Sequence, residues 1–119
     1  ENTGSLVHQT GSDLGEHLRI AALSVSSGHS VLARHPTLFR NVALVVLTKY
    51  DLVPRTHVDL DGLVREIRRT NSRAEVLCTD TRGRVGTDRL AGWLLGYVRA
   101  QRFHPVPPAW NFEPVGLPN

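Results

Sequence analysis

The stretch Val42–Asp51, VALVVLTKYD, decides how the rest of the chain is interpreted. Five consecutive apolar residues, Ala43–Leu47, run directly into the polar group Thr48–Asp51. A short apolar run rich in β-branched residues predicts a strand buried on both faces, as in parallel α/β sheets. In such sheets, ligands bind just beyond the carboxyl ends of the strands. The sequence therefore predicts a ligand contact at Thr48–Asp51.

The side chains after this predicted strand suit a guanine base. The Asp51 carboxylate can accept two hydrogen bonds from N1 and N2 of guanine, and the aliphatic stem of Lys49 can lie along the face of the base. Lys49 is also the only lysine among 14 basic residues, so the chain places its one compact, flexible cation here. The alternative is a surface Lys–Asp pair that follows a buried strand.

Strands alternate with helices in the remaining pattern. Further strands are predicted over Leu18–Val25 and Ala74–Thr79, and helices over His35–Arg40, about Leu60–Thr70, and from Thr87 to about Arg102. The connecting segments Glu1–Glu16, Ser26–Ser30, Leu52–Val58 and Thr81–Gly86 are predicted as loops or turns. The two longer helices are amphipathic, with apolar stripes at Leu60, Leu63, Val64, Ile67 and at Leu90, Trp93, Leu94, Tyr97, Val98.

This order predicts an α/β fold with a parallel sheet and right-handed crossovers. Three strands make a thin sheet, and we expect one of its edges to require cover that this chain does not encode. Residues 1–102 are predicted to be one part of a domain. Residues 103–119 carry five of the seven prolines and have no periodicity, so they are predicted to be disordered or irregularly packed.

Composition restricts the function classes. The net charge of +3 is carried by arginines spread along the chain, without the basic, aromatic-interleaved patch typical of nucleic-acid binding. The longest apolar run is far shorter than the ~20 residues of a membrane span. A single cysteine, Cys78, fits a reducing compartment, and we expect a cytoplasmic protein. The first residues show no signal-peptide pattern. Because the sequence contains no methionine, we expect it to be part of a longer chain.

Three separate segments indicate one nucleotide pocket. In the segment Glu1–Gly4, an acidic residue precedes a glycine, as in a switch whose carboxylate lies near Mg²⁺ and whose glycine N–H reaches a γ-phosphate. The group Thr48–Asp51 would bind the base. Thr79 and Asp80 end the next predicted strand, where a backbone N–H can meet the guanine O6.

These segments resemble a known family. The run ENTGSLVHQTGSDLGEHLRIAALSVSSG (1–28), followed by RHPTLFRNVALVVLTKYDLVP (34–54), is similar to the HypB-type hydrogenase nickel-incorporation GTPases. That family shows E-N-x-G-N-L-V-C, D-L-G, a strand ending S-V-x-x-G, and N-K-x-D-L-x-P. The resemblance covers Glu1 to about Arg99 and implies a three-layer P-loop NTPase-like sheet of the SIMIBI type.

The resemblance also implies a function. It implies a hydrogenase maturation factor that inserts nickel into nickel-iron hydrogenase at the expense of GTP, with Mg²⁺ and with Ni²⁺ or Zn²⁺ bound. Glu1 and Gly4 would then lie beside the metal and γ-phosphate, and Thr48, Lys49, Asp51, Thr79 and Asp80 beside the base. The implied partners are a second copy in a GTP-dependent homodimer, a second nickel accessory protein and the hydrogenase large subunit.

Four departures from the family pattern modify this expectation. Thr48 replaces the asparagine of the base-binding motif, and Ser5 replaces the asparagine after the switch glycine. His8 stands where the family has a metal-binding cysteine; imidazole is also a ligand for Ni²⁺ or Zn²⁺. The sequence contains no G-x-x-x-x-G-K-[ST] motif, which cradles the phosphates and positions Mg²⁺.

The missing phosphate cradle leads to an expectation about activity. Base contacts alone cannot supply most of the affinity for GTP, so the chain by itself is expected neither to hydrolyse GTP nor to bind it tightly. We expect the N-terminal P-loop half to be encoded upstream in a parent GTPase. Two alternatives remain: a non-enzymatic remnant that binds metal or a partner, and a urease-type nickel-delivery GTPase, to which E-N-x-G-x-L-V and D-L-G fit less well.

Overall fold

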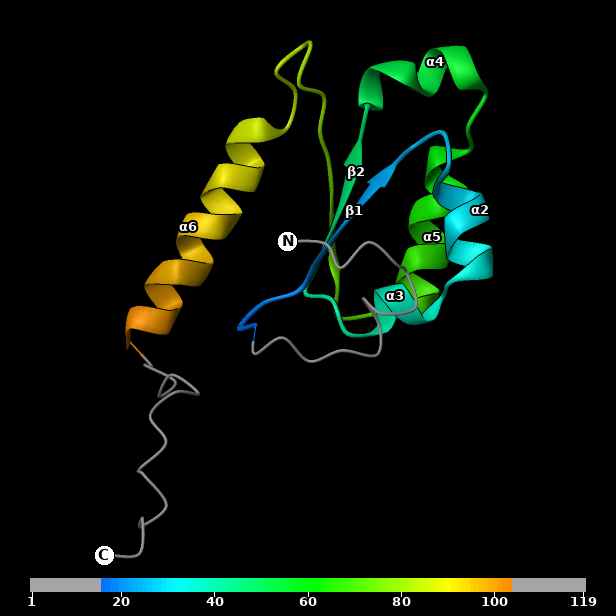
Figure 1. Ribbon diagram of the computed structural model, residues 1–119. Helices are drawn as coiled ribbons and strands as arrows, with labels where there is room; N and C mark the ends of the chain where they lie inside the picture. Colours follow the sequence, from blue (N-terminus) through cyan, green and yellow to red (C-terminus); the bar gives the residue numbers. More distant parts are fainter. Residues whose placement is uncertain (1–15, 104–119) are drawn as a thin grey trace, which may run out of the picture.

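The computed structural model describes residues 16–103, which form a three-stranded parallel sheet with helices on both sides (Figure 1). The strand order is β1-β2-β3, so β2 is central and the two outer strands are edges. The α/β class predicted from the sequence is confirmed. The elements are β1 (Ile20–Ser24), α2 (Gly28–Arg34), α3 (Thr37–Arg40), β2 (Leu44–Thr48), the 3₁₀ turn η1 (Tyr50–Leu52), α4 (Val53–Thr56), α5 (Leu60–Thr70), β3 (Glu75–Cys78) and α6 (Thr87–Phe103).

The central strand β2 is covered on both faces, as its sequence predicts. The four residues 44–47 are all buried, with Leu44, Val45 and Leu47 at 0% exposure. β1 and β3 each pair with β2 in parallel. Because every crossover returns to the same end, the carboxyl ends of all three strands lie at one edge of the sheet. That edge carries the polar groups that follow β2 and β3.

One face of the sheet is packed by α2, α3 and α5. Alternate residues of β2 point to opposite faces, and Val45 and Leu47 belong to the main core cluster. The cluster also contains Leu63 and Ile67 of α5, both completely buried, and Phe39 of α3. This face therefore provides most of the apolar burial that stabilises the described part of the chain.

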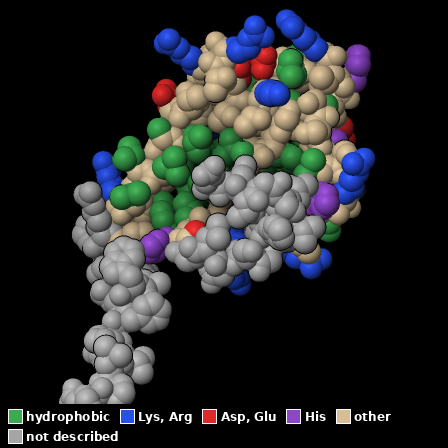
Figure 2. Space-filling view, in the orientation of Figure 1, with side chains coloured by type: hydrophobic (Ala, Val, Ile, Leu, Met, Phe, Trp, Pro, Cys, Tyr) green, Lys and Arg blue, Asp and Glu red, His purple; other side chains and the backbone are tan. Residues whose placement is uncertain are grey.

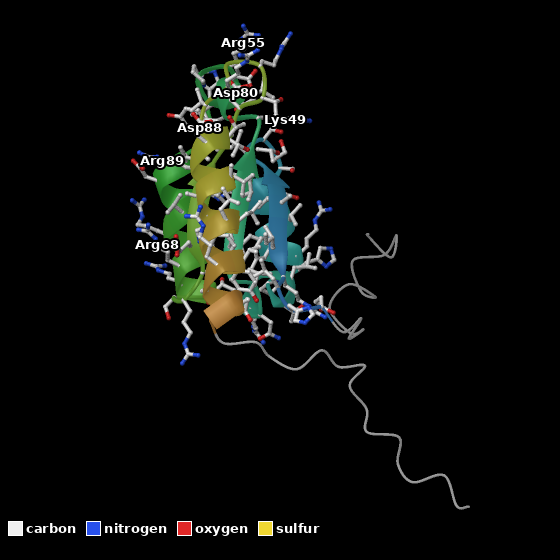
Figure 3. All side chains as sticks on the ribbon, turned by 90° about the vertical axis from the view of Figure 1, so that its left-hand side faces the viewer. Lys49, Arg55, Arg68, Asp80, Asp88 and Arg89 are labelled. Carbon is white, nitrogen blue, oxygen red and sulfur yellow. The ribbon has the colours of Figure 1, made fainter. Side chains whose placement is uncertain are left out.

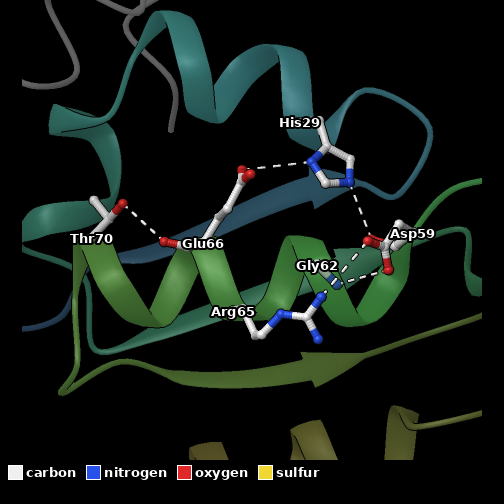
Figure 4. Close-up of polar contacts among 6 residues, drawn as sticks. All are labelled: His29, Asp59, Gly62, Arg65, Glu66 and Thr70. Carbon is white, nitrogen blue, oxygen red and sulfur yellow. Dashed lines mark hydrogen bonds and ion pairs between the residues drawn. The ribbon is translucent and has the colours of Figure 1, made fainter.

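Helix α5 is fixed by polar contacts as well as by its apolar stripe (Figure 4). The Asp59 side chain caps the helix by accepting a hydrogen bond of 2.9 Å from the N–H of Gly62. His29 of α2 lies with Nε2 3.1 Å from the Asp59 carbonyl oxygen and Nδ1 3.6 Å from a Glu66 carboxylate oxygen. One imidazole thus links α2 to two turns of α5.

Asn71 joins the end of α5 to the segment before β2. Its Nδ2 lies 2.7 Å, 3.1 Å and 2.9 Å from the carbonyl oxygens of Phe39, Arg40 and Val42. Its Oδ1 accepts hydrogen bonds from the N–H groups of Arg73 and Ala74. The side chain is buried and fully partnered, so it fixes where β2 and β3 begin relative to α5.

Helix α6 lies on the opposite side of the sheet and stands apart from the other helices (Figure 1). Its Trp93 and Tyr97 rings stack with centroids 6.0 Å apart, and the Tyr97 hydroxyl donates to the His17 carbonyl oxygen at 2.7 Å. Leu94, Leu95 and Val98 are exposed. Figure 2, in the orientation of Figure 1, shows hydrophobic side chains gathered in the middle of the face toward the viewer.

Two segments predicted as loops contain short helices, so those predictions are wrong. Ser26–Ser30 was expected to turn, but α2 begins at Gly28. A Cβ at Gly28 would lie 2.5 Å from a Leu63 methyl carbon, so this glycine permits close approach of α2 to α5. Leu52–Val58 contains α4, in which Pro54 occupies an early position where its missing N–H costs nothing.

The other boundaries differ from the sequence prediction by a few residues at most. The α5 boundaries agree, and β1 and β3 are shorter than predicted. β2 begins and ends one residue later than the apolar run Ala43–Leu47 that predicted it. Pro36 precedes the first helical residue of α3 rather than occupying it. None of the described helices is both long and apolar enough to cross a membrane.

Candidate functional site

The candidate site lies at the carboxyl edge of the sheet, where the segment Thr48–Leu52 follows β2 and the segment Thr79–Gly86 follows β3. Backbone hydrogen bonds join the two segments. The Tyr50 N–H donates to the Thr79 carbonyl oxygen at 3.1 Å, and the Thr79 N–H donates to Leu47 at 2.8 Å. Figure 3 shows Lys49 and Asp80 at the same end of the molecule. The parallel topology thus brings together residues about 30 positions apart.

The backbone of Lys49 is in the left-handed region, with φ 58° and ψ 40°. This conformation is uncommon for a residue with a side chain and costs of order 1 kcal/mol or more. The hydrogen bonds on either side hold it there, because Tyr50 N–H bonds to Thr79 and the Lys49 carbonyl accepts from Leu52 at 2.9 Å. The turn separates the exposed Lys49 from the half-buried Asp51.

The segment Thr79–Gly86 is fixed from inside by Asp80, which is 6% exposed. Its two carboxylate oxygens accept hydrogen bonds from the N–H groups of Arg82 (2.8 Å) and Gly83 (3.0 Å). Asp80 and Val85 exchange two backbone hydrogen bonds of 2.9 Å. Gly86 has φ 75°, and a Cβ there would lie 2.0 Å from the Cys78 carbonyl oxygen, so this position requires glycine.

These bonds determine which groups are available to a ligand. The N–H groups of Thr79 and Asp80 both have backbone acceptors, and the Asp80 carboxylate is occupied by its own loop. Among residues 16–103, the Thr81 N–H has no acceptor, and neither Lys49 nor Asp51 is in an ion pair. Lys49, Asp51 and the Thr81 N–H are therefore polar groups of these two segments that the contacts within residues 16–103 do not use.

The sequence-predicted residues fall into two groups. The structure places Thr48, Lys49, Asp51, Thr79 and Asp80 at the carboxyl edge. The proposed switch residues Glu1 and Gly4 and the proposed metal ligand His8 lie outside the described residues. Within the described range, no group of three or more His, Cys, Asp or Glu side chains is arranged to hold a metal ion.

The structure gives two residues roles that the sequence analysis missed. Asp80 was predicted beside the base, but its carboxylate organises the loop. The sequence contains the signal for this, because an Asp followed three residues later by Gly is typical of a turn closed by the Asp side chain. His29 was placed in a turn, whereas it connects α2 to α5. Cys78 packs against the core, and burial raises the pKa of its thiol.

Comparison with known proteins identifies relatives of the chain and of its fold. No family model matches the chain. The chain is 32% identical over 94 residues to hydrogenase maturation factor HypB of Escherichia coli, covering 79% of this chain and 32% of that protein. It is 30% identical over 90 residues to a probable HypB of Methanocaldococcus jannaschii, covering 76% of this chain and 41% of that protein. A urease accessory protein, UreG 2 of Methylobacterium radiotolerans, matches 72 residues at 31% identity, covering 60% of this chain and 35% of that protein.

Two solved structures share the fold. HypB of Archaeoglobus fulgidus superposes with a TM-score of 0.73 at 29% identity, covering 79% of this chain and 46% of that chain. HypB of Helicobacter pylori, solved in complex with nickel, gives a TM-score of 0.72 at 20% identity and covers 77% and 43%. The second likeness concerns the fold alone.

The described part of the chain therefore has the α/β fold of P-loop GTPases. By sequence and by fold, the chain is related to one segment of the hydrogenase maturation factors of the HypB family. It spans roughly a third of the length of the curated relatives that it matches.

Proposed function

We propose that this chain supplies the guanine-recognising edge of a GTP-dependent hydrogenase maturation factor. The observation that carries the proposal is the joined pair of segments after β2 and β3, in which Tyr50 N–H bonds to the Thr79 carbonyl. In this arrangement Asp51 accepts from N1 and N2 of the base, Lys49 covers its face and the Thr81 N–H donates to O6. Thr48 stands where an asparagine is usual and connects the strand to the turn.

The chemistry of these residues determines which part of a nucleotide they can bind. An edge made of a carboxylate, an alkyl stem and one N–H recognises a base but cannot neutralise a triphosphate. The phosphate-cradling motif does not occur in the 119 residues. We therefore expect base-selective but weak binding by this chain, and no release of phosphate above background when it is mixed with GTP and Mg²⁺.

A nucleoside titration tests the base contacts without requiring phosphate contacts. We expect guanosine, at about millimolar concentration, to shift the backbone amide NMR signals of Lys49–Leu52 and Thr79–Arg82, and adenosine to leave them unchanged. The variant Asp51→Asn replaces two acceptor oxygens by one acceptor and one donor, so the preference should move from guanosine to xanthosine.

Asp59→Asn is the matched control, because it makes the same change in an exposed aspartate outside the segments Thr48–Leu52 and Thr79–Gly86 and leaves an N-capping oxygen. It should bind guanosine like the unmodified chain. Equal shifts with guanosine and adenosine, or an unaltered preference in Asp51→Asn, would remove Asp51 from the base contact and disprove the proposed site.

A metal site is the second part of the proposal. It rests on His8, which stands where the family pattern has a metal-binding cysteine, and on the nickel complex of the related H. pylori protein. We expect His8→Ala to lower the Ni²⁺ or Zn²⁺ bound per chain in equilibrium dialysis. His57→Ala, an exposed histidine after α4, is the control and should change nothing. Unchanged metal content in His8→Ala would remove His8 from the proposed metal site.

The wider role is proposed from the family. A cytoplasmic maturation factor of this type would place Glu1 and Gly4 beside Mg²⁺ and the γ-phosphate, form a GTP-dependent homodimer, and deliver nickel with a second accessory protein to the hydrogenase large subunit. A non-enzymatic protein that binds metal or a partner through the same surface is the second candidate. Selective binding of guanosine favours the first, and metal binding without base selectivity favours the second.

A further inference from the structure

Two large apolar side chains are exposed at the carboxyl edge of the sheet. Tyr50 follows β2 and is 38% exposed, and Val85 lies in the segment after β3 and is 46% exposed. The Tyr50 N–H bonds to the Thr79 carbonyl oxygen, and Val85 exchanges two backbone hydrogen bonds with Asp80. Both residues are therefore fixed to neighbouring strand ends. Exposed apolar side chains with a polar rim are typical of protein-binding surfaces.

Four basic residues provide such a rim. Lys49 directly follows β2, and Arg55 lies in the last turn of α4. Arg82 and Arg84 belong to the loop between β3 and α6. Figure 1 shows α4 and this loop at the same end of the sheet, and Figure 3 shows Lys49 and Arg55 at that end. The exposed residues of this surface, which we call the basic edge, are Lys49, Tyr50, Arg55, Arg82, Arg84 and Val85.

Acidic side chains do not balance the charge of the basic edge. None of its four basic residues is in an ion pair formed within residues 16–103. The carboxylate of Asp80 is buried and accepts hydrogen bonds from two N–H groups of its own loop. Asp51 is half-buried. The exposed part of this edge is therefore mainly positive, and it attracts an acidic partner.

Two residues of the basic edge have a backbone that is unfavourable for the side chain they carry. Lys49 and Arg84 have φ values of 58° and 57°, in the left-handed region where residues other than glycine are uncommon. Glycine adopts this conformation at lower cost, so the turns themselves do not require a lysine or an arginine. Strained positions of this kind cluster at binding sites.

We propose that the basic edge binds an acidic segment of another protein, with carboxylates on the arginines and an aliphatic side chain against Tyr50 and Val85. The planar guanidinium pairs well with carboxylates, and Arg and Tyr are enriched in protein interfaces. A nucleic acid fits this surface less well, because Val85 offers no ring on which a base can stack.

The interaction requires neither nucleotide nor metal and does not rest on the proposed guanine site. Lys49 contributes to both surfaces, so the variants that test the basic edge leave Lys49 unchanged. Failure of one proposal can therefore be distinguished from failure of the other.

A titration of the full chain with the blocked peptide EEELLEEE tests the surface. The backbone amide NMR signals are followed at low salt, without nucleotide and with a chelator. We expect binding at about 1 mM or tighter, with shifted signals in residues 49–55 and 81–86 and weaker binding at high salt. The peptide QQQLLQQQ, without carboxylates, should not bind. The peptide EEEQQEEE, without aliphatic side chains, should bind more weakly than EEELLEEE.

Removing the arginines of the basic edge should weaken binding of EEELLEEE. An exposed ion pair contributes roughly two- to fivefold to affinity. The triple variant Arg55→Gln, Arg82→Gln and Arg84→Gln should therefore bind roughly tenfold more weakly or worse. The matched control makes the same change in net charge at exposed arginines in or after the last turns of α2 and α5, and should bind like the unmodified chain: Arg34→Gln, Arg68→Gln and Arg73→Gln.

The single variant Arg84→Gly separates peptide binding from the stability of the loop. Glycine relieves the left-handed backbone, so the resistance to urea should be unchanged or higher. Binding of EEELLEEE should nevertheless weaken roughly two- to fivefold. Unweakened binding would remove Arg84 from the basic edge.

Three results would overturn the proposal as a whole. An absence of shifts at the basic edge would mean that it does not bind acidic segments. Equal affinity in the triple variant and its control would mean that the peptide responds to net charge and not to this surface. Tighter binding of single-stranded oligothymidine than of EEELLEEE, lost in the triple variant, would make the basic edge a nucleic-acid site.

Discussion

Helices α5 and α6 lie on opposite sides of the same sheet, and both carry an apolar stripe in the sequence. In α5 the stripe is matched by the sheet and by α2, so Leu63 and Ile67 are completely buried. In α6 Leu94 and Val98, which belong to the predicted stripe, remain 38% and 48% exposed. The comparison teaches that periodicity predicts which residues share a face, whereas burial depends on what lies opposite that face.

The largest expected difference between the two sides is in the cost of a truncated leucine. Leu63→Ala should lower the free energy of unfolding by roughly 2–5 kcal/mol, because it removes completely buried carbon atoms and leaves a cavity. Leu95→Ala should cost less than about 1 kcal/mol, since Leu95 is more than half exposed and alanine favours a helix. Urea unfolding of the two variants, at a concentration below any self-association, measures both values.

Equal losses in the two variants would contradict the comparison. A large loss in Leu95→Ala would mean that the Leu95 side chain is buried in solution. A small loss in Leu63→Ala would mean that the core on the α5 side can collapse around the missing side chain.

The sequence predicts the structure of the α5 side better than that of the α6 side, because burial depends on what lies opposite each apolar stripe. The boundaries of α5 agree because an N-cap at Asp59 and a stripe ending near Ile67 are local signals that point to one element. The burial of β2 follows from its apolar run. The turn predicted at Gly28 was wrong because the sequence alone does not distinguish a glycine that allows close packing of a neighbouring helix from a glycine that forms a turn.

The candidate site was predictable in position but not in geometry. Parallel strands bring their carboxyl ends to one edge, so finding Lys49, Asp51 and Thr79 together needed only the strand order. The left-handed backbone of Lys49 depends on hydrogen bonds from another strand and has no local signal. Asp80 could be assigned to this edge, and Gly83 three residues later was a signal for a turn closed by the Asp80 side chain. The sequence does not say which N–H groups that carboxylate accepts from, and the structure shows that they are those of Arg82 and Gly83.

The second prediction tests whether buried polar contacts, like the apolar core, stabilise the α5 side of the sheet. Asn71→Ala should lower the free energy of unfolding by roughly 1–3 kcal/mol, because buried carbonyl groups of the segment before β2 lose their donor. Asn41→Ala removes an exposed asparagine from the same segment and should cost much less. Chemical denaturation of both variants measures the difference, and similar values would show that the Asn71 contacts are replaced by water at little cost.

The smallest expected effect concerns the contact that holds α6. Tyr97→Phe keeps the stacked ring beside Trp93 and removes only the hydroxyl that donates to the His17 carbonyl at 2.7 Å. Because the contact is exposed, its loss should cost about 0.5–1 kcal/mol. Hydrogen exchange is the more direct measurement: amides of α6 should exchange faster in Tyr97→Phe, while those of α5 keep their protection. Faster exchange in both helices would mean that α6 unfolds together with the core. The two sides of the sheet would then differ in the exposure of their side chains but not in local stability.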